Sequence, residues 1–150
     1  MPEPSSSSSL EEALRVLPHG EGFRFIDSLS TLRPGEQGEG RYTLKGDEDF
    51  LRGHFPGQPI LPAVIMVEAL AQLGGVVFQS GLKIPLADMR LTAMRNVKVF
   101  GTAVPGDVLV IRAAVSGQLG TLIQIEGEVV CADRKLMSAQ ITLSGREPSG

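Results

Sequence analysis

Hydrophobic residues follow two different patterns along this chain, and the change between them falls near residue 80. From Pro62 to about Gln79 nearly every position is apolar, so a helix over this segment would be buried almost all the way round. Pro62 suits the first turn of such a helix, and Gly81 suits its end. Beyond Gly81 apolar and polar residues alternate, which is typical of strands with one buried face.

The alternating pattern predicts a sheet made largely of consecutive strands. In the C-terminal half the expected strands cover residues 91–100, 108–116, 122–131 and 136–144. Short polar turns between them favour an antiparallel meander. A single apolar helix placed before such a meander indicates an α+β fold in which the sheet wraps around the helix.

The N-terminal third is less regular. Apolar residues at helical spacing predict a short helix over residues 10–17 that stops at Pro18. Two strand-like segments, 23–32 and 40–45, lie on either side of a turn at Pro34-Gly35. The segment that follows, up to residue 62, is rich in proline, glycine and charge, and we expect it to be an irregular loop.

Composition narrows the function classes. The 150 residues predict one domain over 10–145, with disordered tails at 1–9 and 146–150. A net charge of −3 argues against nucleic-acid coating as the main function. The single cysteine, Cys131, excludes an internal disulfide and fits a reducing compartment. The N-terminus does not resemble a secretory signal, and Glu68, Gln72 and glycines interrupt the apolar helix, so we expect a soluble, cytoplasmic protein.

Glu68 is the most informative residue, because a carboxylate in a buried helix is costly unless it is paired or protonated. Burial favours the protonated form of a carboxylic acid, which suits a group that must deliver a proton near neutral pH. His54 lies just upstream, in a loop stiffened by proline and glycine. The two residues together outline an acid/base pair. The plain alternatives are a surface histidine and a structural carboxylate paired with an arginine.

These residues belong to a longer motif that resembles a known family. The motif is Gly53-His54-Phe55-Pro56-Gly57-Gln58-Pro59-Ile60-Leu61-Pro62, followed by Val64 and by Glu68-Ala69-Leu70-Ala71-Gln72. It is similar to the active-site signature of the (3R)-hydroxyacyl-(acyl carrier protein) dehydratases, which are hotdog-fold enzymes of type II fatty acid synthesis. Weaker matches at Leu17-Pro18-His19 and at 97–107 extend the resemblance from about residue 17 to about residue 144. Glu68, rather than Asp, and the lack of tryptophan resemble the branch that dehydrates without isomerising.

The resemblance implies a reaction and two catalytic residues. Dehydration of a 3-hydroxyacyl thioester removes a proton from C2 and water from C3, and yields a trans-2-enoyl product. His54 is expected to be the base and Glu68 the acid, because imidazole titrates near neutral pH and a buried glutamic acid can stay protonated. The alternative is that the two residues share these roles through a water molecule.

Four further residues are candidates for substrate binding. Gly57 permits close backbone approach, and Ala63 and Val64 offer N–H groups in the first turn of the helix that would polarise the thioester carbonyl. Gln72 lies one turn after Glu68, and would orient Glu68, contact the substrate or serve a structural role. His19 is interpreted as structural. An acyl chain also needs an apolar tunnel, for which the candidate lining residues are Val64, Ile65, Val67, Leu70, Met94, Val99 and Ile111.

The resemblance also implies partners. The substrate would be carried on the phosphopantetheine of acyl carrier protein, with no metal or redox cofactor needed. Arg90, Arg95 and Lys98 are candidates for docking this acidic carrier, and a solvated strand face is the alternative. Family members are at least homodimers, with each active site taking its His from one subunit and its Glu from the other, and hexamers are known. Joining sheets edge to edge also removes exposed strand edges.

Two rival functions stay open, the first because of the fold and the second because of three departures from the family pattern. Ala63 stands where glycine is usual, Gly20-Glu21-Gly22 replaces an Arg-Tyr-Pro-like run, and Gly101 replaces a basic residue. The first rival is an acyl thioesterase on the same fold, because a fold does not determine function. The second is a non-catalytic dehydratase paralogue that binds acyl chains or a dehydratase subunit.

Overall fold

A computed structural model describes residues 7–15, 17–51 and 59–148 of the chain. Two α-helices and six strands form its framework. The helices are α1 (Ser7–Leu14) and α2 (Ala63–Ser80), with short 3-10 turns at Glu21–Phe23 and Asp49–Leu51. The strands are β1 (Ser28–Arg33), β2 (Gln37–Thr43), β3 (Ala87–Val99), β4 (Val108–Leu119), β5 (Leu122–Cys131) and β6 (Arg134–Arg146).

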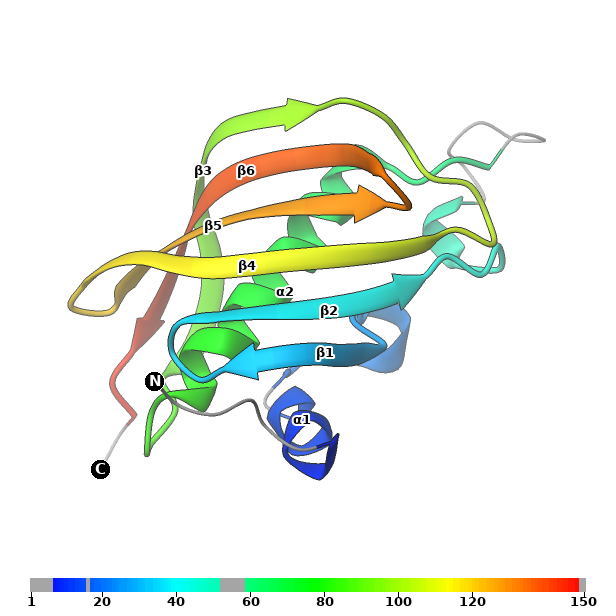
Figure 1. Cartoon of the computed structure of the whole chain (residues 1–150). Helices are drawn as coiled ribbons and strands as arrows, with labels where there is room; N and C mark the ends of the chain where they lie inside the picture. The colour runs from blue at the N-terminus through cyan, green and yellow to red at the C-terminus, as the bar shows by residue number, and fades with distance from the viewer. Residues whose placement is uncertain (1–6, 16, 52–58, 149–150) are drawn as a thin grey trace.

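All six strands belong to one antiparallel sheet in the order β1-β2-β4-β5-β6-β3. The sheet curves around α2, which crosses its concave face, and β1 and β3 are the two edges (Figure 1). This arrangement confirms the α+β hotdog fold expected from the sequence. The meander prediction holds for β4, β5 and β6, but β3 pairs with β6 rather than with β4, its neighbour in the chain.

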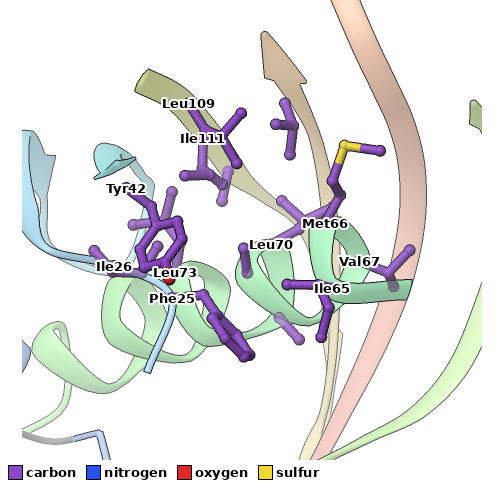
Figure 2. Packing of buried hydrophobic residues seen from close by; sticks show 14 of the residues in the cluster. Phe25, Ile26, Tyr42, Ile65, Met66, Val67, Leu70, Leu73, Leu109 and Ile111 are labelled. Carbon is purple, nitrogen blue, oxygen red and sulfur yellow. The ribbon is translucent and has the colours of Figure 1, made fainter. Parts of the chain in front are cut away.

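Helix α2 forms the centre of the core, as its apolar composition predicts. Met66, Leu70 and Leu73 are fully buried. Figure 2 shows these helix side chains packed among residues of the sheet, including Ile111 and Tyr42. By length and composition α2 could cross a membrane, but 72% of the helix is buried inside the protein, which is the character of a core helix.

The boundaries of the elements differ from the sequence prediction mainly at the N-terminus. Helix α1 begins at Ser7, inside the serine run expected to be a disordered tail, and ends at Leu14. The segment expected to be a strand from residue 23 forms β1 only from Ser28. Helix α2 agrees closely, with Pro62 as its N-cap and Gly81 as its C-cap. The expected tails at 1–6 and 149–150 lie outside the described residues.

Two glycines at or near α2 differ in the space available for a side chain, and each yields a stability prediction. A methyl group on Gly127 of β5 would overlap the Leu70 side chain and the carbonyl oxygen of Arg112, whereas one on Gly75 of α2 would meet nothing within 4 Å. We expect Gly127→Ala to lower the free energy of unfolding by about 1–3 kcal/mol through overpacking. Gly75→Ala should raise it by about 0.5–1 kcal/mol, because alanine loses less backbone entropy in a helix.

Urea unfolding of the two variants beside the wild-type protein measures both changes. Equal midpoints for the wild-type and Gly127→Ala proteins would contradict the close approach of α2 to β5. A destabilised Gly75→Ala protein would contradict the open space beside that turn of the helix.

Candidate active site

A cavity of about 410 Å³ lies along one face of α2. Glu68, Gln72, Gly75 and Gln79 line it at helical spacing, so they occupy successive turns of the same face. The opposite walls come from the segment 17–19 and from residues of β3 and β6. On this face the core helix carries polar side chains toward an open space.

Glu68 is the only charged residue of α2, and its side chain is 22% exposed, toward this cavity. Its Oε1 atom lies 3.2 Å from the amide nitrogen of Gln72 and 3.2 Å from Nε2 of His19. In the described part of the chain the partners of Glu68 are therefore an amide and an imidazole, and not the arginine that a structural ion pair would supply. A carboxyl group held at a cavity wall in this way is available for proton transfer.

Gln72 is buried and its amide is held at both ends. The amide oxygen accepts a hydrogen bond from the backbone N–H of Phe25 at 2.8 Å, and the nitrogen donates to the carbonyl of Phe23 at 2.8 Å and to Glu68. Both N–H groups are thus engaged within the protein. Among the three roles left open by the sequence, these contacts argue against a substrate contact and fit both a structural role and the orientation of Glu68.

His19 is the site residue that sequence reasoning missed, since the sequence supported only a structural role. The segment Leu17-Pro18-His19 enters the cavity wall opposite α2, and the His19 ring stacks near Phe23 with 6.0 Å between ring centroids. The signal available was the match of this segment to the opening of the family motif. Sequence alone did not place it against Glu68, because the two residues are far apart in the chain.

His54 and Gly57 lie outside the described residues. The described chain resumes at residue 59 and enters α2 through Pro62, whose extended backbone (φ −62°, ψ 136°) sets the start of the helix. Ala63 is half-buried, and Val64 is 73% exposed in the first turn. The backbone N–H groups of Ala63 and Val64 have no partners within the helix, so this end of α2 can donate hydrogen bonds to an oxygen with partial negative charge.

The loop that leads toward His54 is anchored by Glu48. Its carboxylate accepts hydrogen bonds from the Tyr42 hydroxyl at 2.5 Å and from the backbone N–H groups of Lys45 and Gly46. Burial opposes ionisation of Glu48, but these hydrogen bonds outweigh it and lower its pKa. Burial, together with the same carboxylate, raises the pKa of Tyr42 well above its usual value. At neutral pH the pair is therefore a neutral phenol and a carboxylate, and the hydrogen bond between them fixes the start of this loop.

The three proposed docking cations lie on β3. Arg90, Arg95 and Lys98 are all exposed, and Arg90 also lines the cavity. The guanidinium of Arg134 lies beside Gly101, about 3.9 Å from where a Cβ on that glycine would stand. A cation is therefore present near Gly101, although the basic residue usual in the family is missing.

The apolar lining of the cavity differs from the sequence prediction. Leu70 and Ile111 are fully buried in the core, whereas Val64, Met94 and Val99 are exposed on the surface of the chain. Their place on an acyl tunnel stays a prediction, and none of the seven residues lines this cavity. The residues that line it on the apolar side are Leu17, Ala71, Val76, Met89, Leu91 and Leu143.

Comparisons with known protein families and proteins show which family this chain resembles. Residues 17–140 match the model of the FabA-like domain. The chain is 34% identical over 136 residues to a 3-hydroxyacyl-(acyl carrier protein) dehydratase, FabZ, from Clostridium acetobutylicum, covering 91% of this chain and 96% of that protein. It is 35% identical over 134 residues to FabZ from Syntrophomonas wolfei, covering 85% and 93% of the two chains.

Solved structures share the fold. The dehydratase heterocomplex ApeI:P from Xenorhabdus doucetiae matches with a TM-score of 0.75 and 22% identity, covering 91% of each chain. A hypothetical thioesterase from Streptococcus pneumoniae, solved with coenzyme A, matches with a TM-score of 0.61 and 12% identity, covering 80% of this chain and 87% of that one. At these identities the likeness establishes the fold alone.

A curved antiparallel sheet around one core helix, with a glutamate facing a cavity, defines a hotdog-fold protein of the FabA-like class. Within this class, the chain belongs to the 3-hydroxyacyl-(acyl carrier protein) dehydratase family, as its identity to FabZ proteins over most of both chains shows.

Proposed function

We propose that this protein dehydrates (3R)-hydroxyacyl groups carried on acyl carrier protein to trans-2-enoyl groups, in type II fatty acid synthesis or a related lipid or polyketide pathway. Membership of the dehydratase family supports the reaction class. The observation that carries the proposal to this chain is Glu68, held by two side chains at the wall of a largely apolar cavity. An apolar cavity suits an acyl chain, and a carboxylic acid suits the departure of a hydroxyl group.

The proposed chemistry needs one base and one acid. His54 takes the proton from C2, and the electron pair of that C–H bond forms the C2–C3 double bond. Glu68 gives a proton to the C3 hydroxyl, which leaves as water. The proton on His54 then returns to Glu68 through solvent, and the two groups recover their starting states. The chemistry uses only protein groups and requires no metal or redox cofactor.

The start of α2 is proposed to stabilise the charge that develops on the thioester oxygen. The N–H groups of Ala63 and Val64 are in the first turn of an 18-residue helix, where the helix dipole is positive. Gly57 would allow the loop backbone to approach the same oxygen closely. Val64 is exposed and Ala63 is half-buried, so this turn lies near the surface of the chain, where a tethered substrate can reach it.

The active unit is proposed to be a homodimer joined along β3. This strand pairs with β6 on one side and is an edge of the sheet on the other. Met94, Val99 and Phe100 on or next to it are more than half exposed. An unpaired edge with large exposed apolar residues is a surface that proteins normally cover. A hexamer built from three such dimers is a further possibility that the family resemblance raises.

Acyl carrier protein is the proposed carrier of the substrate, and Arg90, Arg95 and Lys98 are proposed to dock it. These residues are exposed on β3, and Arg90 reaches the cavity wall, so a carrier bound there would stand close to the cavity. Positive charge near the opening favours an acidic partner. A cytoplasmic location fits this proposal and the single, buried, unpaired Cys131.

A turnover assay tests the proposed function. The purified protein is given 3-hydroxybutyryl and longer 3-hydroxyacyl thioesters on acyl carrier protein, and enoyl product and free thiol are followed together. Enoyl formation without thiol release is the expected result. Thiol release without enoyl product would instead establish the rival thioesterase, and neither product at any chain length would indicate the non-catalytic paralogue.

A further inference from the structure

The two oxygens of Glu68 differ in their surroundings. Oε1 has two nitrogen partners, Gln72 Nε2 and His19 Nε2, each at 3.2 Å. The contacts that fix Glu68 in the described part of the chain thus converge on one oxygen, which leaves Oε2 for other partners. Because Glu68 lines the cavity, Oε2, which has no partner among the described residues, is the oxygen left to meet a bound molecule there.

The direction of the Gln72 hydrogen bond follows from its other contacts. Its amide oxygen is taken by the N–H group of Phe25, so its NH₂ group must be the end that faces Glu68 and the carbonyl of Phe23. Gln72 is therefore a donor and Oε1 of Glu68 an acceptor. A carboxylic acid that accepts at Oε1 carries its own proton on Oε2, because the carbonyl oxygen is the better acceptor of the two.

The surroundings of the second ring nitrogen indicate which tautomer of His19 faces Glu68. Nδ1 is buried and has no hydrogen-bond partner among the described residues. A hydrogen on Nδ1 would be a buried, unpaired donor, which proteins avoid more strictly than an unpaired acceptor. Among the described residues this favours the tautomer with its hydrogen on Nε2, and that hydrogen is donated to Glu68 Oε1.

We propose that His19 is a positioning residue for dehydration, which with Gln72 clamps Oε1 of Glu68 and reserves Oε2, with its proton, for the substrate hydroxyl. This inference rests on the proposed function. It assigns His19 an action through Glu68 without contact with the reacting atoms. The clamp holds the carboxyl plane in one rotation, so that the acid is already aligned when substrate binds.

Four forms of the protein test the clamp through steady-state kinetics. His19→Gln keeps an uncharged N–H donor that reaches about as far as Nε2, His19→Leu keeps similar bulk without a donor, and His19→Asn carries the same amide on a shorter chain. We expect His19→Leu and His19→Asn to lower kcat about 10–100-fold with KM changed less than about threefold. His19→Gln should stay within about threefold of the wild-type kcat.

Unfolding midpoints of all four forms show whether each variant is folded. His19→Leu and His19→Asn remove the donor in different ways, so each checks that a loss of kcat in the other does not come from misfolding. Wild-type kcat in His19→Leu or His19→Asn would overturn the inference. So would an equal loss in His19→Gln, or a rise in KM at unchanged kcat, which would mean a contact with substrate instead. Failure of the wild-type protein to form any enoyl product would overturn the proposed function itself, which is a separate result.

Discussion

Replacing Glu68 by glutamine is expected to lower kcat for dehydration about 10²–10⁴-fold, the usual contribution of one general acid. Glutamine keeps the size of the side chain, and its carbonyl oxygen can accept the hydrogen bonds that Gln72 and His19 give to Oε1. Its NH₂ group stands where the acid proton is needed, and it cannot release a proton to a departing hydroxyl. The binding cavity is otherwise unchanged, so KM should change much less than kcat.

Enoyl formation from a 3-hydroxyacyl thioester on acyl carrier protein measures this effect. Glu36→Gln is the matched control. Glu36 is exposed in the turn between β1 and β2, so its substitution makes the same chemical change away from the cavity. The control should retain wild-type kcat. If Glu68→Gln also retained it, Glu68 would be a structural carboxylate, and the acid would have to be another group.

Mixing two inactive variants is expected to restore activity. If each site takes His54 from one subunit and Glu68 from the other, a dimer of one His54→Ala chain and one Glu68→Ala chain has one site without either residue and one intact site. Random pairing of equal amounts makes half of the dimers mixed, so about a quarter of all sites should be intact. Co-expressed variants should therefore show about a quarter of wild-type activity, from two proteins that are nearly inactive alone.

The control for this experiment is a chain carrying both substitutions, co-expressed with the wild-type chain. Each mixed dimer then lacks one residue at each site, so only wild-type homodimers are active and about a quarter of the sites remain intact. Activity of the two single variants that stays at the sum of their separate values, in dimers shown to exchange, would place His54 and its Glu68 in the same chain. That outcome would be compatible with the dehydratase reaction but would contradict an active site shared between two subunits.

Much of the fold was determined by the sequence itself. The apolar run of α2 needs a surrounding core, and the alternation in β4, β5 and β6 predicts strands with one buried face, so a sheet around a helix followed from these two patterns. The end of α2 and the bounds of β5 were predicted closely for the same reason. The candidate acid was also visible, because Glu68 is the one charge in an otherwise uncharged core helix.

Other features depended on contacts between distant segments. The place of β3 at the sheet edge, beside β6, was decided by pairing between residues about 40 to 60 positions apart, which local alternation does not encode. The same holds for the site, because His19 meets Glu68 only after the N-terminal segment has folded against α2, and Gln72 is oriented by the backbone at residues 23 and 25. Sequence spacing fixes which side chains share a face of one helix, whereas the partner across a cavity is set by tertiary packing alone.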